Sequence, residues 1–442
     1  MEDDVAHVTL GDEWRIPSRA EAVELIENCD WEYTTLNGVK GVVGTSKSNS
    51  KTIFFPFAGY KTSVNVADTD PNPNFWSKRQ HKSGFGDPRN PYRAGDYFHV
   101  DPEYGTDADL RDFVDRTHVL GMKVLLDLVF FHCGPSAGVL LRHPEYFRHN
   151  PDGFLMLGEW HFPTFDYDNP ATRAYLKSIM AYYVADFDVD GFRLDVADQV
   201  PLDFWEEARE MLDALRPGLV LAAEGDRPEN TLKAMDINYN FPVCRKLRKM
   251  VSDHFKRGGV MDISQIRRAH EEYMSQCPRG TLVWNYSENH DTATDSYDNR
   301  MEKCYGYQFN TLYLAFCFAL DGVPFIVNGQ EACYDRRISL FGHKDCWIDW
   351  ETALATPQAQ ERQANIRSWA QMRRDYSSLT SGKTVWLDNN CPESVCSFVR
   401  RDGVSPDIFF VGNFSDQKRK IRLSDGHRLT LEPFSFFFGP WK

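Results

Sequence analysis

The 442-residue chain has no run of about 18 consecutive apolar residues, the length at which a helix could cross a bilayer. Its first residues, MEDDVAHVTLGDEW, are acidic and have neither the basic nor the apolar region of a signal peptide. The first absence excludes a membrane-spanning helix. The second predicts a cytoplasmic protein, or an exported one if its signal lies outside this chain.

The chain also has fewer basic residues than acidic ones. Lys and Arg number 50 against 64 Asp and Glu, a net charge of −14, and the acidic residues are spread along the whole chain. Such a surface could not hold the phosphates of nucleic acid or of an anionic membrane. A neutral substrate fits better, and the oligomeric state stays open.

The ten cysteines are scattered and form no CxxC pair. This pattern disfavours both a zinc site and a disulfide framework, so we interpret most of the cysteines as core thiols. At this length the chain suits one large domain and one or two small ones.

Between about residues 105 and 330, helical and strand-like segments alternate. Apolar runs typical of parallel strands covered on both faces are KVLLDLVFFH, VDGFRLD, LVLAAEG, AMDINYNF, TLVWNYSENHD and VPFIVNG. Amphipathic stretches with apolar residues at helical spacing separate them, as in 176–187. Repeated βα units with polar residues at the strand ends predict a (β/α)₈ TIM-type barrel.

Both ends of the chain differ from this pattern. Residues 381–442 contain short alternating strands between turns and predict a small antiparallel β domain. Residues 1–77 predict a helix between two tryptophans and then a hairpin with a polar tip. By spacing, TIFFPFA could be the first barrel strand, but the polar stretch 76–90 does not resemble a second one. We therefore expect a barrel, in residues 78–380, whose first two strands are not recognisable.

Four carboxylates follow separate strands of this predicted barrel. Asp195 and Glu224 lie 29 residues apart, one βα unit of roughly 30 residues; the other two are Asp127 and Asp291. Cleavage of a glycosidic bond with retention needs two carboxyl groups about 5 Å apart, one a nucleophile and the other a general acid. Three further polar residues accompany them: His132, Arg193 and His290. Each residue also has a structural interpretation, namely an ion pair, a loop carboxylate or a core histidine.

These residues lie in four segments that occur in order: DLVFFH, GFRLD, AAEG and ENHD. In sequence and spacing the segments resemble the four signature regions of the α-amylase family, glycoside hydrolase family 13. DYFHVDPEYGT, PTFDYDNPATR and GVPFIVNGQE resemble further segments of that family, so the resemblance extends from about Tyr92 to the C-terminus. GFRLDVADQVPLDFWEEAR is most similar to members acting on cyclic or short maltodextrins and pullulan.

The resemblance implies a role for each residue. Asp195 is implied as the nucleophile, Glu224 as the general acid/base and Asp291 as the stabiliser of the transition state. The implied substrate contacts are Tyr92, by stacking, together with Asp127, His132, Arg193 and His290.

The resemblance requires no cofactor for the chemistry, and it allows a structural calcium. The Asn that commonly binds calcium in the family is, however, Phe131 here, and the Asp expected after the stacking tyrosine is Arg93. The first substitution weakens the case for calcium. The second weakens the contact with the sugar at the non-reducing end.

Residues 1–77 resemble a different family, the Fibrobacter succinogenes major paralogous domain, through AHVTLGDEWRIPSRAEAVELIENCDW, LNGVKG, TSKSNS and IFFPFAGY. That resemblance implies a lectin-like fragment joined to the barrel near Trp76.

The functional hypothesis is hydrolysis or transfer of α-glucosidic bonds in starch-type oligosaccharides. An alternative is a catalytically impaired carbohydrate-binding or remnant protein, because an incomplete barrel would loosen the mouth where the carboxylates meet. A third interpretation is a surface adhesion module.

Overall fold

The structure is a computed structural model, and it describes residues 28–36, 39–56, 90–102, 104–158, 160–258, 261–294, 300–338 and 347–441. The chain divides into two compact units, residues 1–87 and 88–442. Each unit is described by itself. Two predicted regions lie largely or wholly outside the described residues. They are the helix between the two N-terminal tryptophans and the region after residue 56 in which the first two barrel strands were expected.

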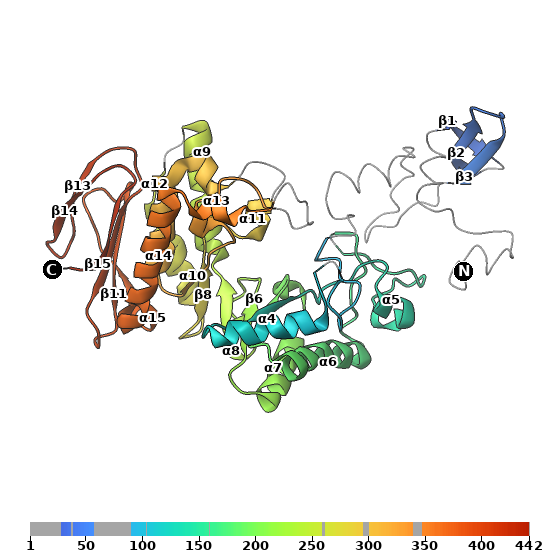
Figure 1. Ribbon diagram of the computed structural model, residues 1–442, viewed down its shortest axis with the longest axis horizontal. Coiled ribbons are helices and arrows are strands. Elements are labelled where there is room, and N and C mark those ends of the chain that lie inside the picture. The colour runs from blue at the N-terminus through green and yellow to red at the C-terminus, as the bar shows by residue number, and fades with distance from the viewer. Residues whose placement is uncertain are drawn as a thin grey trace. The chain divides into compact units, whose positions relative to one another are not determined.

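The N-terminal unit contains an antiparallel three-stranded sheet (Figure 1). Its strands are β1 (Cys29–Leu36), β2 (Val39–Ser46) and β3 (Thr52–Pro56). β2 and β3 pair across a tight turn in which Ser50 N–H donates to Ser46 O at 3.0 Å. The predicted hairpin is therefore confirmed. The alternative interpretation of TIFFPFA as a barrel strand is wrong, because β3 pairs antiparallel with β2.

The larger unit is built on a parallel sheet with the strand order β4-β5-β6-β7-β8-β9. These strands are β4 (Leu125–Leu128), β5 (Gly191–Leu194), β6 (Val220–Ala223), β7 (Ile237–Tyr239), β8 (Leu282–Asn285) and β9 (Val323–Pro324). Consecutive strands are neighbours throughout, as sequential βα units require. The predicted barrel architecture is confirmed in the part of the chain that the structure describes.

Helices follow most of these strands. They are α4 (Asp107–Val119), α5 (Gly138–Arg142), α6 (Pro170–Phe187), α7 (Leu202–Leu215), α8 (Asn230–Lys233), α9 (Phe241–Arg257), α10 (Ser264–Gln276), α11 (His290–Thr294), α12 (Met301–Ala319), α13 (Trp350–Leu354), α14 (Pro357–Asp375) and α15 (Ser377–Thr380). Within the described ranges, no helix has the length and apolar character to cross a membrane.

Helix α6 shows how the sequence places these layers. Asn169 caps its first turn by accepting from Ala171 N–H, and Pro170 occupies the first helical position, where a missing N–H costs nothing. The apolar stripe predicted within 176–187 is fully buried at Leu176, Ile179 and Met180. It covers the sheet, whose strand β5 is buried on both faces. Apolar periodicity thus fixes which face of the helix meets the barrel.

Residues after α15 form the predicted C-terminal β domain. Its strands are β10 (Lys383–Trp386), β11 (Val395–Arg401), β12 (Ile408–Asn413), β13 (Arg419–Arg422), β14 (Arg428–Leu431) and β15 (Phe436–Pro440). They form a sheet of order β10-β11-β12-β15 and a β13-β14 ribbon, both antiparallel. In Figure 1 the red strands stand beside α12 and α14. The ring of Phe316 on α12 lies 6.2 Å from that of Phe398 and 5.8 Å from that of Phe410.

A partly buried polar network also joins the C-terminal domain to the barrel. Asp321 Oδ1 lies 2.7 Å from His270 Nε2 and accepts from Thr384 Oγ1 at 2.8 Å, while Trp386 Nε1–H donates to His270 Nδ1 at 3.2 Å. Because Nδ1 accepts, Nε2 carries the proton of a neutral ring and donates to Asp321. Burial acts to raise the pKa of Asp321, but His270, Arg400 and Thr384 together lower it to about 2.

We expect Asp321→Asn to lower the free energy of unfolding by roughly 2 kcal/mol at pH 7. The depressed pKa means that this stabilisation is complete above about pH 4, the pKa of an unfolded Asp, and is lost as pH falls toward about 2. Urea unfolding of both chains across this range measures it, and the two stabilities should converge at low pH. Asp112→Asn, which removes an exposed pair with Arg116, is the control and should change stability little. A difference that is independent of pH would contradict the expectation.

Candidate active site

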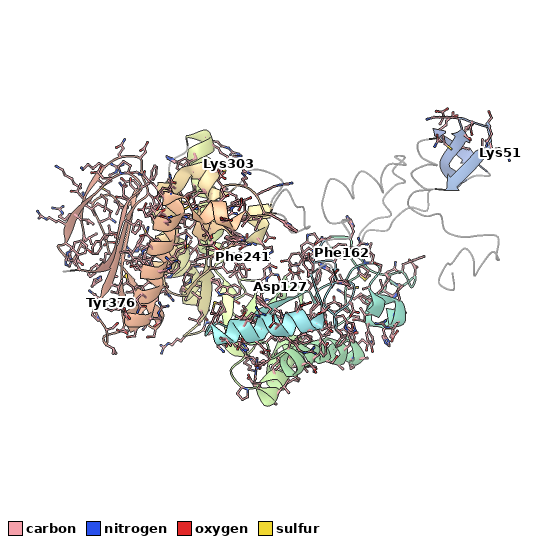
Figure 2. The ribbon with its side chains drawn as sticks, viewed as in Figure 1. Lys51, Asp127, Phe162, Phe241, Lys303 and Tyr376 are labelled. Carbon is pink, nitrogen blue, oxygen red and sulfur yellow. The ribbon has the colours of Figure 1, made fainter. Side chains whose placement is uncertain are left out.

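The predicted site residues gather where parallel strands end. Asp127 on β4 is in register with Arg193 on β5, and each is the second-to-last residue of its strand. Asp195 follows β5 directly, and Glu224 follows β6 directly. In a parallel barrel these carboxyl ends share one edge, so all four side chains face a common mouth. Asp127 is labelled in Figure 2.

Arg193 links three of the carboxylates. Its Nη1 donates to Asp127 Oδ1 and to Asp195 Oδ1, both at 2.8 Å, and its Nη2 lies 2.9 Å from Glu224 Oε2. The Arg193 side chain is 8% exposed. Burial acts to lower its pKa, but the charges of Asp127 and Glu224 outweigh burial and hold the pKa well above the ordinary value. The guanidinium therefore stays charged and holds the carboxylates together.

Asp195 is the most deeply buried of these carboxylates, with 6% of the residue exposed. Burial raises its pKa well above the ordinary value, and the charges of Glu224 and Asp127 add to the rise, while Arg193 opposes it. Two carboxyl groups close enough to affect each other's ionisation are the arrangement that retaining glycosidases use.

Glu224 is fixed from the turn after β5. The backbone N–H of Val196 donates to Glu224 Oε2 at 2.8 Å, and the N–H of Ala197 donates to the main-chain oxygen of Glu224 at 3.0 Å. On the strand side, Glu224 N–H donates to Leu194 O at 3.0 Å. Main chain and carboxylate are thus both anchored by residues that flank Asp195.

Tyr92 and His290 close another side of the mouth. The Tyr92 hydroxyl donates to Asp127 Oδ2 at 3.1 Å and lies 2.8 Å from His290 Nε2. The two rings stack with centroids 5.6 Å apart. Burial and the charge of Asp127 raise the pKa of Tyr92, so its hydroxyl stays protonated and able to donate.

Asp291 follows β8, as expected, but it lies six residues beyond the end of that strand, within the short helix α11. Its carboxylate accepts from Asn289 Nδ2 at 3.0 Å and lies 3.2 Å from His290 Nε2. Partial burial acts to raise its pKa, but His290 and Arg193 lower it overall. Asp291 is more exposed than Asp195 and is held ionised.

His132 is buried behind Tyr92. Its Nε2 lies 3.0 Å from the Tyr92 carbonyl oxygen, and burial lowers its pKa to about 4, although the bond to Tyr92 opposes this. The rings of Phe162 and Trp160 lie 5.0 and 5.6 Å from the imidazole. At neutral pH the ring is uncharged and holds the backbone of Tyr92.

The position implied for a calcium ligand does not fit the ion. Phe131 presents a ring that meets Trp160 edge-on at 6.2 Å, with no oxygen to offer. Hard cations such as calcium need several oxygen ligands. Across the described ranges, no group of three or more His, Cys, Asp and Glu side chains is arranged to hold a metal ion.

The sequence did not single out Tyr239, which ends β7 next to the site. The residue is buried, and its ring centroid lies 6.0 Å from Arg193 Cζ. Burial raises the pKa of Tyr239 to about 12, an effect that Arg193 opposes. A tyrosine at the carboxyl end of a predicted barrel strand was the only available signal, and it could not be separated from ordinary core packing.

Residues 72–146 and 145–391 match the family described as "Alpha amylase, catalytic domain". The chain belongs to the alpha-amylase family. The maltogenic alpha-amylase of Bacillus acidopullulyticus is 33% identical over 368 residues, and a cyclomaltodextrinase of Geobacillus thermopakistaniensis is 26% identical over 363 residues. Each alignment covers 75% of this chain and 58% of the relative. The chain thus spans little more than half the length of these curated relatives.

A solved structure of this family also resembles the chain. A noncanonic maltogenic alpha-amylase from Thermotoga neapolitana has a TM-score of 0.66 and 29% identity, and the match covers 76% of this chain and 74% of that one. The alpha-amylase barrel with its C-terminal β domain is therefore established as the fold of this family member.

Proposed function

We propose that this alpha-amylase family member is a retaining glycosidase that cleaves α-glucosidic bonds in starch-type oligosaccharides. The observation that carries the proposal is the pair Asp195 and Glu224, at the ends of adjacent strands and joined through Arg193. The names of the relatives, maltogenic amylase and cyclomaltodextrinase, support maltodextrins or cyclodextrins as substrates.

The proposed reaction is a double displacement. Asp195 attacks the anomeric carbon and forms a glycosyl ester while Glu224 protonates the leaving oxygen; Glu224 then removes a proton from the water that cleaves the ester. In the free protein, the Glu224 carboxyl group lies 2.9 Å from Arg193 Nη2 and accepts a hydrogen bond from the Val196 N–H.

The other residues bind the sugar in this proposal. Tyr92 stacks on the ring at the cleavage point, and Asp291, His290 and Asp127 offer hydrogen bonds to its hydroxyls. Asp291 is held ionised in the free protein and suits the stabilisation of positive charge in an oxocarbenium-like transition state. His132 acts through Tyr92. No metal or organic cofactor takes part in these steps.

The test is release of reducing sugar from maltohexaose, pullulan and β-cyclodextrin by the purified chain, beside an Asp195→Asn variant. Release by the parent chain alone supports the proposal, and the substrate cleaved fastest identifies the preferred linkage and ring form. If a folded parent chain and its variant are equally inactive, the glycosidase proposal is wrong. The remaining explanation is then a carbohydrate-binding or remnant protein.

We infer in addition that residues 1–77 form a lectin-like module separate from the barrel. The sequence resemblance and the sheet of β1, β2 and β3 support this inference. Retention of the Asp195→Asn chain on insoluble polysaccharides, compared with the same variant lacking residues 1–77, tests it. A cytoplasmic location, or export by a signal outside this chain, likewise stays a proposal, which fractionation of the source cells would decide.

A further inference from the structure

The turn that follows the nucleophile has an unusual backbone. Val196 lies in the left-handed region with φ 38° and ψ 46°, where a β-branched residue is rarely found. Such a conformation persists only where its surroundings fix it, and it occurs mostly at functional sites. In this conformation the Val196 N–H reaches Glu224 Oε2 at 2.8 Å.

Asp198, two residues further on, connects this turn to the loop that carries Glu224. Its Oδ2 accepts from the backbone N–H groups of Asp226 at 3.0 Å and Arg227 at 3.3 Å. Its Oδ1 accepts from the side-chain amide of Asn230 at 2.9 Å. One carboxylate thus receives three donors from the seven residues that begin at Glu224.

Gly225 makes this close approach sterically feasible. A Cβ atom on Gly225 would lie 2.4 Å from Asp198 Oδ1, closer than real Cβ contacts. At its far end the loop is held as well: Asn230 Nδ2 lies 3.2 Å from Asn238 Oδ1, and Asn238 Nδ2 donates to Arg227 O at 2.9 Å. Asn230 and Asn238 are both fully buried. The loop therefore rests on β7 and on Asp198.

We propose that Asp198 is a positioning residue for Glu224. Its carboxylate bonds not to the Glu224 side chain but to the backbone N–H groups of Asp226 and Arg227, and so it fixes the main chain on the carboxyl side of Glu224. Leu194 and Ala197 fix the main chain at Glu224 itself. Loss of the Asp198 acceptors leaves two backbone N–H groups of the loop without partners, so the loop relaxes and the acid moves from its place. This inference rests on the proposed function, in which Glu224 is the general acid.

The test separates acid catalysis from the rest of the reaction by means of the leaving group. Fluoride departs from α-maltosyl fluoride without needing a proton, whereas the sugar departing from maltotriose needs one. For Asp198→Ala we expect kcat/KM for maltotriose to fall about 30- to 100-fold and kcat/KM for the fluoride to fall less than about 3-fold. Asp198→Asn, which keeps one acceptor oxygen, should restore part of the loss. Glu224→Gln is the reference and should show the same discrimination between the substrates.

Asp190→Asn is the matched control. Its carboxylate also accepts a backbone N–H, that of Val124 at 2.8 Å, but it lies just before β5, at the opposite end of the strand from the site. Any loss it causes should be equal for both substrates. Gly225→Ala, which displaces the Asp198 carboxylate directly, provides a second variant with the same expected discrimination if the Asp198 variants do not fold.

Two results would overturn the positioning role: equal losses on both substrates, or full activity in Asp198→Ala. A wild-type chain that is folded but inactive on both substrates would instead overturn the proposed function itself, and the positioning role with it.

Discussion

Asp195→Asn should lower kcat/KM by about 10⁴-fold or more, because the amide cannot attack the anomeric carbon. The same substitution should raise the melting temperature at pH 7. The pKa of Asp195 is raised in the folded protein, so folding is penalised once pH rises above the ordinary value near 4 and the carboxylate ionises. A neutral side chain of the same shape removes that penalty while Arg193 keeps its other partners. Initial rates on maltotriose and thermal unfolding measure the two effects.

Trapping of the intermediate provides an independent measurement. Incubation with a 5-fluoro glycosyl fluoride should add one glycosyl unit to the intact chain, on the peptide that contains Asp195, and the Asp195→Asn chain should not be labelled. Asp190→Asn is the control, since it removes a partly buried carboxylate at the other end of the same strand and should still be labelled. Labelling on another residue, or wild-type rates in the Asn variant, would show that the nucleophile is elsewhere.

Arg193→Met should destabilise the protein by about 3–5 kcal/mol at pH 8, because it leaves the Asp195 and Glu224 side chains, which are 9% and 13% exposed, without their cation. Asp127, Asp195 and Glu224 would then repel one another, and the pKa of Asp195, which burial already raises and Arg193 opposes, would rise further. Groups whose pKa is raised in the folded state cost stability only after they ionise, so the loss should be smaller at pH 5 than at pH 8. Urea unfolding at both pH values measures this. We also expect kcat/KM to fall roughly 10³-fold as the carboxylates move apart.

Arg173→Met is the matched control for this charge cluster. Arg173 also joins two carboxylates, those of Asp203 and Glu207, but these partners are 66% and 43% exposed. Water can replace the lost bonds there, so the cost should stay near 1 kcal/mol or less at either pH. If the two variants lose equal stability, or if the loss at Arg193 does not depend on pH, then the Arg193 cluster is not an electrostatic unit.

The sequence correctly predicted that Asp195 and Glu224 come directly after strands. Each follows a short apolar run that fills a buried strand, GFRL or VLAA. The fold class followed from the same runs and from the helical stripes between them. For Asp291 the strand prediction extended too far. The strand ends at Asn285, and the chain then forms a loop and α11, although Ser287, Glu288 and Asn289 of that loop are buried.

Other parts of the site could not be predicted from local pattern. Asp198 contacts backbone groups 28 and 29 residues further along the chain, and no spacing rule reports such a contact. The left-handed conformation of Val196 is equally hidden, since its sequence context, LDVAD, is that of an ordinary strand end. Tyr239 was not singled out, because a tyrosine within an apolar run has no property that marks it as part of a site. These residues depend on tertiary contacts, which single-sequence patterns do not encode.

Helix α12 has a consequence for how this protein can have evolved. The helix is part of the barrel, and its residue Phe316 packs against Phe398 and Phe410 of the C-terminal sheet. A recombination event that exchanged only the C-terminal domain would bring in a sheet with the wrong aromatic complement for that helix. It would also separate Trp386 from His270. We therefore expect barrel and β domain to share one line of descent, with α12 and the sheet changing together.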